Sequence, residues 1–165
     1  MRNFYKIIFI ITFGVLFSCK TSNDKEYAVI KKSFSEKDTL TNERLTPFEH
    51  YVIREKGTER AFTGEYWDFF EEGIYVCKAC NQKLFDSESK FESNCGWPSF
   101  DKAIKGSVIY TKDTSLGMDR IEVTCSNCKG HLGHVFDDGP EETTGQRFCT
   151  NSVSIKFIPK NEIPD

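Results

Sequence analysis

The sequence predicts one mainly β domain with few helices, stabilised by a metal site. Short runs of β-branched and aromatic residues, bounded by Gly, Asp, Asn or Pro, recur through the second half of the chain. Aromatic residues make up 14% of the 165 residues and can fill a compact core. Two Cys-x-x-Cys pairs each follow a strand-like run, which is the usual arrangement of zinc ligands.

Residues 1–18 have the pattern of an export signal. Positive residues precede an apolar run over residues 7–17, which is too short for a membrane span of about 20 residues. The run ends in Leu16-Phe17-Ser18-Cys19, which resembles a bacterial lipobox. We therefore expect Cys19 to become the lipidated first residue of the mature protein. The alternative is a plain secretory signal with an incidental cysteine.

Residues 19–40 are polar and lack a sustained hydrophobic period, so they are predicted to be a flexible tether before a folded domain at residues 41–160. The expected location is the cell envelope, as a membrane lipoprotein facing the periplasm or the cell surface. The net charge of −3 argues against a nucleic-acid partner. We expect a monomer.

The first element of the domain is predicted to be a helix. Thr46 can cap its start, Pro47 suits the first helical position, and Glu49 stands where a capping box has its acid. Gly57 is a plausible stop.

Strand signals dominate after this helix. They cover residues 74–76, 107–111, 120–125 and 147–158. The third run predicts a half-buried strand, because apolar and polar residues alternate along it. Its apolar face would be Ile121, Val123 and Cys125, and its polar face Arg120, Glu122 and Thr124.

Four cysteines form the predicted zinc site: Cys77, Cys80, Cys125 and Cys128. Two turns of this kind can place four thiolates at the corners of a tetrahedron and leave no open position, so the zinc would be structural. Residues 81–124 separate the pairs, and the metal would therefore join distant parts of one fold. Two alternatives stay open, because an exported chain can form disulfides and a Cys-x-x-Cys pair can be redox-active.

Cys95 and Cys149 lie outside that site. On a strand, Arg147, Cys149 and Asn151 share one face, which residues 153, 155 and 157 would continue into the core. The Arg147 guanidinium favours a Cys149 thiolate. His131 and His134 offer imidazoles as proton donors. The alternative is a buried structural cysteine.

The chain resembles the methionine-R-sulfoxide reductases of the B type over residues 41–160. Four segments carry the resemblance: 57–64 (GTERAFTG), 95–100 (CGWPSF), 131–136 (HLGHVF) and 147–152 (RFCTNS). The resemblance implies a small, mostly antiparallel β domain of two sheets with short peripheral helices. Family members that carry zinc use two Cys-x-x-Cys pairs. Asn94 and Phe148 depart from the family pattern, and Phe148 is expected on the strand face opposite Cys149.

The resemblance also implies roles for individual residues. Cys149 would be the nucleophile, Cys95 the resolving cysteine, and Trp97 the aromatic ring that receives the substrate methyl group. The polar wall around the sulfoxide would be His131, His134, Asp138, Arg147 and Asn151. The implied partners are oxidised protein substrates and a thioredoxin-like reductant.

Two other classes of protein compete with this interpretation. A zinc-ribbon module could bind nucleic acid or protein, and the acidic mature chain and the export signal argue against nucleic acid. A general thiol–disulfide oxidoreductase would use one Cys-x-x-Cys pair and keep its activity without Cys149.

Overall fold

The computed structural model describes residues 45–163. The predicted signal peptide, the tether and Cys19 lie outside these residues. Within residues 45–163, no helix is long and apolar enough to cross a membrane.

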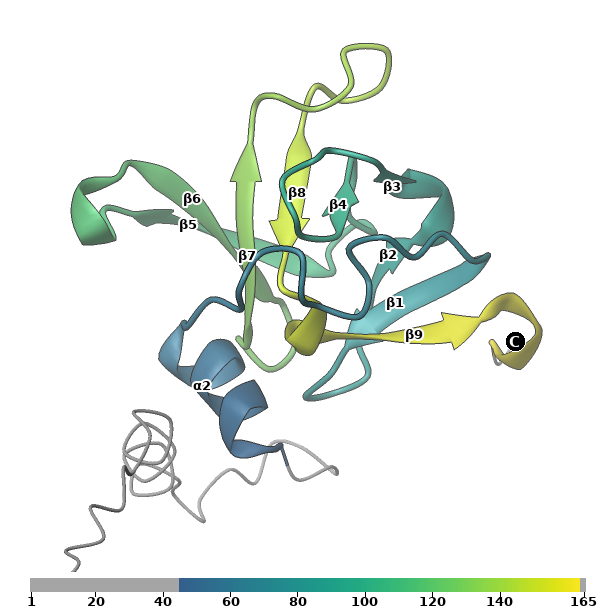
Figure 1. Ribbon diagram of the computed structural model, residues 1–165, viewed down its shortest axis with the longest axis horizontal. Helices are drawn as coiled ribbons and strands as arrows, with labels where there is room; N and C mark the ends of the chain where they lie inside the picture. The colour runs from purple at the N-terminus through teal and green to yellow at the C-terminus, as the bar shows by residue number, and fades with distance from the viewer. Residues whose placement is uncertain (1–44, 164–165) are drawn as a thin grey trace, which may run out of the picture.

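Two antiparallel sheets make up the described domain (Figure 1), which confirms the predicted fold class. One sheet has 3 strands in the order β2-β1-β9, and the other has 6 strands in the order β3-β4-β8-β7-β6-β5. The strands are β1 (Gly73–Cys77), β2 (Lys83–Asp86), β3 (Lys90–Phe91), β4 (Ser99–Phe100), β5 (Val108–Asp113), β6 (Arg120–Cys125), β7 (His131–Phe136), β8 (Arg147–Thr150) and β9 (Ile155–Pro159). Short 3-10 turns are η1 (Ser87–Ser89), η2 (Ser115–Gly117), η3 (Ser152–Ser154) and η4 (Lys160–Glu162).

The predicted helix is α2 (Pro47–Glu55), and its start is as expected. The Thr46 hydroxyl accepts a hydrogen bond from the Glu49 N–H, and the Glu49 carboxylate accepts one from the Thr46 N–H. The end of the helix differs from the prediction: the left-handed residue after it is Lys56, with φ 60°, and not Gly57. Gly57 is required for space, since a Cβ there would lie 2.2 Å from the Tyr51 ring.

The predicted strand over residues 147–158 is wrong as one element. It is split into β8 and β9 by η3, and the two strands belong to different sheets. The face shared by Arg147 and Cys149 therefore does not continue along the chain into the core. The sequence signals also missed β2, β3, β4 and β7, because β3 and β4 have only 2 residues each and β7 contains two histidines and a glycine.

The predicted alternation in β6 is wrong at Ile121 and Glu122, although Val123 and Cys125 are buried as predicted. Ile121 is 39% exposed and Glu122 is buried. Glu122 can be buried because its carboxylate accepts a hydrogen bond from Lys56 Nζ at 2.7 Å and contacts His131 Nδ1 at 2.8 Å. A register shift between Val123 and Thr124 then changes the alternation further along the strand.

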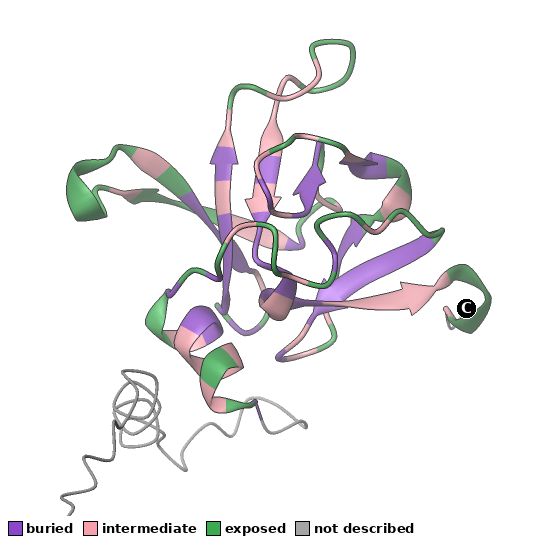
Figure 2. Ribbon diagram, viewed as in Figure 1, coloured by how far each residue is buried: buried purple, intermediate pink, exposed green. Residues whose placement is uncertain are grey.

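An aromatic cluster joins the two sheets. Figure 2 shows β1 and β4, two of the strands that contribute its rings, as buried. Phe85 of β2 stacks on Phe100 of β4 with ring centroids 4.3 Å apart, and Tyr75 of β1 meets Phe100 at 5.0 Å. Phe148 of β8 packs edge-on against Phe85 at 5.8 Å. Because Phe148 points into this core, its neighbour Cys149 projects from the opposite face of β8, as predicted.

Candidate active site and metal site

The two Cys-x-x-Cys turns have the same backbone geometry. In the first, the Cys77 N–H donates to the Gln82 carbonyl, and the Asn81 N–H donates back to the Cys77 carbonyl. In the second, the Cys125 N–H donates to the Gly130 carbonyl and the Lys129 N–H to the Cys125 carbonyl. In each turn the residue after the second cysteine is left-handed: Asn81 has φ 57° and Lys129 has φ 61°. Both turns are therefore built to point two sulfurs the same way.

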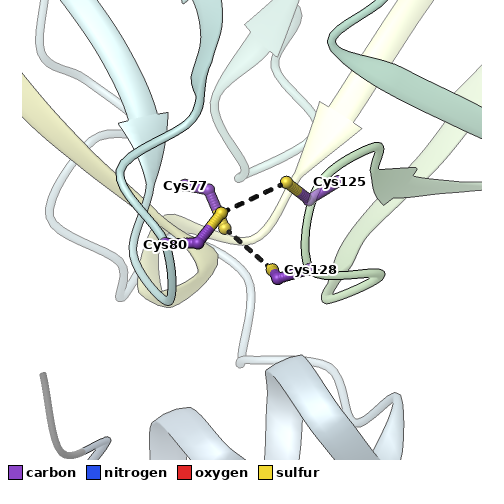
Figure 3. A group of neighbouring side chains, drawn as sticks. All are labelled: Cys77, Cys80, Cys125 and Cys128. Carbon is purple, nitrogen blue, oxygen red and sulfur yellow. Dashed lines mark hydrogen bonds between the residues drawn. The ribbon is translucent and has the colours of Figure 1, made fainter. Parts of the chain in front are cut away.

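The four sulfurs of Cys77, Cys80, Cys125 and Cys128 converge on one point (Figure 3), and all lie within 4.8 Å of one another. The Sγ atoms of Cys77 and Cys128 are 3.6 Å apart, as are those of Cys80 and Cys125. A disulfide would need about 2.05 Å, and a tetrahedral zinc with bonds of about 2.3 Å places its sulfurs about 3.8 Å apart. The cysteines are thus free thiols in a set that fits a metal ion.

The four cysteines lie where the two sheets meet, so a metal ion bound to them would join the sheets. Cys77 is the last residue of β1 in one sheet, and Cys125 is the last residue of β6 in the other. Helix α2 covers the site, because Arg54 Nη1 donates to the Cys128 carbonyl at 3.0 Å and Lys78 Nζ lies 3.4 Å from Glu49. The sulfurs of both Cys-x-x-Cys pairs face one another in this cluster, so neither pair is well placed to exchange a disulfide with another protein. This argues against a general thiol–disulfide oxidoreductase.

Cys95 and Cys149 meet on the face of β8 that is opposite Phe148 and the aromatic core. Cys149 pairs in register with Ser99 of β4 and with His134 of β7. The loop before β4 carries Cys95, whose sulfur lies 3.7 Å from the Cys149 sulfur. A glycine at position 133 allows β7 to approach, because a Cβ there would lie 1.9 Å from the Cys149 carbonyl oxygen. The predicted redox pair is therefore in contact and reduced.

The two thiols share one hydrogen bond, and their surroundings decide which one holds the charge. The hydrogen bond from Cys149, together with those from Ser93 and Ser99, lowers the pKa of Cys95 to about 4. The hydrogen bond to Cys95 and burial raise the pKa of Cys149, and Arg147 acts in the opposite direction. Arg147 therefore lowers the pKa of Cys149, as expected, but the hydrogen bond to Cys95 raises that pKa by more.

A cavity of about 120 Å³ opens beside Cys149. Four residues from the sequence prediction line it: Trp97, His134, Cys149 and Asn151. Thr58, Arg120, Gly133 and Phe136 complete the wall. His131 is not among them; it is 3% exposed and tied to Glu122. Of the two histidines, His134 is therefore the one placed to exchange a proton with a bound ligand.

Arg147 and Asp138 form an ion pair at the rim of this site. Nε and Nη2 of Arg147 each lie 2.9 Å from a carboxylate oxygen of Asp138, a bidentate geometry. The guanidinium also lies 4.6 Å from the centre of the Phe136 ring. Neither Arg147 nor Asp138 lines the cavity, although both were predicted for its polar wall; Arg147 contacts the lining through the Phe136 ring.

Sequence reasoning missed two charged residues near the cavity. Arg120 lines it, and Asp113 accepts a hydrogen bond from Arg120 Nη2 at 2.7 Å and contacts His134 Nε2 at 2.8 Å. Both residues lie at the tip of the β5–β6 hairpin. The contact between Asp113 and His134 depends on the register of β6 against β7. No local motif marks that register.

These features define a mainly β domain with four cysteines that could hold a metal ion and a separate pair of contacting thiols beside a cavity. The SelR domain model matches residues 45–159. The chain is 56% identical over 118 residues to a peptide methionine sulfoxide reductase MsrB of Chromohalobacter salexigens, with 71% of this chain and 89% of the relative covered. It is 48% identical over 144 residues to an MsrB of Burkholderia lata, covering 86% and 97%. The chain belongs to the SelR domain family and, within it, to the MsrB peptide methionine sulfoxide reductases, which are oxidoreductases.

Proposed function

We propose that this protein reduces methionine R-sulfoxide in oxidised proteins to methionine. The observation that carries the proposal is the contact between Cys95 and Cys149 at a cavity that Trp97, His134 and Asn151 also line. This arrangement offers a sulfur nucleophile, a second thiol to resolve its oxidised form, an apolar ring and polar groups for an oxygen. The relatives' printed names describe the same substrate class.

The first step transfers oxygen to the enzyme. As Cys149 attacks the sulfoxide sulfur, its proton can pass to the Cys95 sulfur 3.7 Å away. The sulfoxide oxygen gains negative charge and accepts a proton, which His134 can supply. The oxygen then moves from the substrate sulfur to the Cys149 sulfur, the bond between these two sulfurs breaks as methionine leaves, and Cys149 is left as a sulfenic acid.

The second step closes a disulfide. The Cys95 sulfur bonds to the Cys149 sulfur, and the oxygen of the sulfenic acid leaves as water. An external dithiol of the thioredoxin type then takes up the oxidising equivalent by exchange and restores both thiols. The chiral cavity selects the R epimer when the methyl group lies against Trp97 and the oxygen lies toward the polar wall.

We infer that the metal of the four-cysteine site is zinc. Four thiolates in a closed tetrahedral set suit zinc and leave no position for a substrate. Cys77, Cys80, Cys125 and Cys128 would hold the ion, which supplies structural stability rather than chemistry.

Separated epimers test the proposed function most simply. We expect the purified domain, with dithiothreitol as reductant, to release methionine from the R epimer of a peptide sulfoxide and to leave the S epimer unchanged. Product is measured by chromatography. Equal turnover of both epimers, or turnover of the S epimer alone, would refute the proposal.

We propose a lipid anchor at Cys19 and a location in the cell envelope, on the strength of the lipobox-like residues 16–19. Mass spectrometry of the membrane-bound mature protein should find a diacylated Cys19 as its first residue. Cys19→Ser should abolish this modification and leave the catalysis of the isolated domain unchanged. An unmodified Cys19 in the membrane-bound protein contradicts the anchor.

The thioredoxin-like partner and the monomeric state stay predictions.

A further inference from the structure

The loop that joins α2 to β1 carries a carboxylate that no role described above explains. Glu59 is 3% exposed, although residues beside it in this loop, such as Arg60, are exposed. In Figure 1 the loop is the dark blue segment that follows α2. A buried carboxylate is costly unless hydrogen bonds satisfy it, so its contacts indicate what it holds in place.

The backbone of Glu59 contacts two residues of the cavity wall. Its N–H donates to the Asn151 side-chain oxygen Oδ1 at 3.0 Å, and its carbonyl accepts a hydrogen bond from the indole Nε1 of Trp97 at 3.2 Å. Asn151 directly follows β8, the strand that carries Cys149, and Trp97 lies in the loop before β4 that carries Cys95. The position of this one peptide segment therefore sets the distance between them.

The side chain of Glu59 fixes that segment to η3, the turn that follows the Cys149 strand β8. Its two carboxylate oxygens accept hydrogen bonds from the backbone N–H groups of Ser152 and Val153. These are the first residues of η3, immediately after Asn151, and η3 has no other side-chain cap at its start. The Ser152 hydroxyl in turn accepts a hydrogen bond from the Tyr66 N–H at 3.1 Å. The loop and the turn are thus tied at several points around one carboxylate.

The remaining contact of Asn151 shows what this positioning does. Its Nδ2 donates one hydrogen to the Leu132 carbonyl at 3.1 Å, and its Oδ1 is occupied by the Glu59 N–H. An amide nitrogen has two hydrogens, so one N–H of Asn151 is left for an oxygen in the cavity. We infer that Glu59 is a positioning residue for sulfoxide reduction: it orients Asn151 toward the sulfoxide oxygen and keeps Trp97 across the cavity from it. The inference rests on the proposed function for the identity of that ligand.

The test compares Glu59→Gln with Glu71→Gln, which removes the same charge from an exposed position of the same loop. Glutamine keeps one acceptor oxygen and presents an NH₂ group to the second backbone N–H. We expect Glu59→Gln to slow methionine release in a single turnover by about 10- to 100-fold, as a displaced catalytic group does. Reduction of the preformed Cys95–Cys149 disulfide by dithiothreitol should keep its rate, because that step uses neither Asn151 nor Trp97. Glu71→Gln should match the wild type in both steps.

A double-mutant cycle with Asn151→Ala separates positioning from general loosening of the fold. If Glu59 acts through Asn151, then adding Glu59→Gln to Asn151→Ala costs much less than it costs alone. A wild-type single-turnover rate in Glu59→Gln, an equal slowing of both steps, or fully additive losses would each overturn the inference. If Glu59→Gln does not fold, Glu59→Asp is judged by the same criteria, since it shortens the reach of the carboxylate.

A readout independent of activity distinguishes this inference from the proposed function. The indole N–H resonance of Trp97 and the side-chain amide resonances of Asn151 should shift and exchange faster with solvent in Glu59→Gln, and not in Glu71→Gln. Unchanged resonances contradict the positioning role whatever the substrate is. A wild-type protein that reduces neither sulfoxide epimer would refute the proposed function, while these resonances would still report on Glu59.

Discussion

Cys149→Ser is expected to lose all measurable sulfoxide reduction with any reductant, while Cys95→Ser keeps the first step. A serine hydroxyl at position 149 is a far weaker nucleophile than a thiol at neutral pH. Cys95 forms its bond only after methionine has left, so Cys95→Ser should release about one methionine per enzyme and then stop with a thioredoxin-type donor. Rapid-quench measurement of methionine in both variants checks this.

The surroundings of the two sulfurs sharpen this expectation. Without Cys95, Cys149 loses the hydrogen bond that is the main cause of its raised pKa, and Arg147 still favours the thiolate. Cys95→Ser should therefore be alkylated at Cys149 at lower pH than the wild type. Ser126→Ala, in a turn of the metal site, is a control that should leave both steps unchanged. Full thioredoxin-dependent turnover by Cys95→Ser would mean that another group resolves Cys149.

Loss of one metal ligand is expected to remove the metal and the stability of the domain together. Structural zinc sites contribute about 10–16 kcal/mol of apparent binding energy, which is comparable to the whole stability of a typical domain. Cys77→Ser breaks the link at the end of β1, and Cys125→Ser breaks it at the end of β6. Each variant should lack the metal by elemental analysis and unfold far below the wild-type temperature, and a strong chelator should have the same effect on the wild type.

Asn127→Ala is the matched control, because Asn127 is exposed and lies between two ligands of the same turn. It should retain about one zinc per chain. A metal-free wild-type domain that is fully stable, with Cys77, Cys80, Cys125 and Cys128 in disulfides, would contradict the metal site.

The parts of the fold that follow local rules could be predicted from the sequence. The start of α2 depends on the capping box of Thr46 and Glu49 and on Pro47 at the first helical position. The strand that ends at Cys125 has the predicted bounds. The split between β8 and β9 could not be predicted, because residues on both sides of η3 favour strands. The turn is stabilised by Glu59, which lies far away in the sequence.

In the candidate site, too, local structures could be predicted and contacts between distant residues could not. The four-cysteine cluster could be predicted from spacing alone, since each turn is a local structure. The contact between Cys95 and Cys149 was implied by the family resemblance. Local patterns could not distinguish His134 from His131, because that difference depends on the buried Glu122 and on which residues pair across β6 and β7. Asp113, Arg120 and Glu59 were missed for the same reason: their partners are distant in sequence.

The path of the sulfoxide oxygen tests the central claim most directly. Cys95→Ser is mixed with a peptide methionine R-sulfoxide that carries a heavy oxygen isotope, and the protein is digested and sequenced by mass spectrometry after one turnover. The account predicts that the isotope is found on the Cys149 sulfur, in an amount equal to the methionine released. Methionine release with no labelled oxygen on Cys149, or with the label on another cysteine, would contradict it.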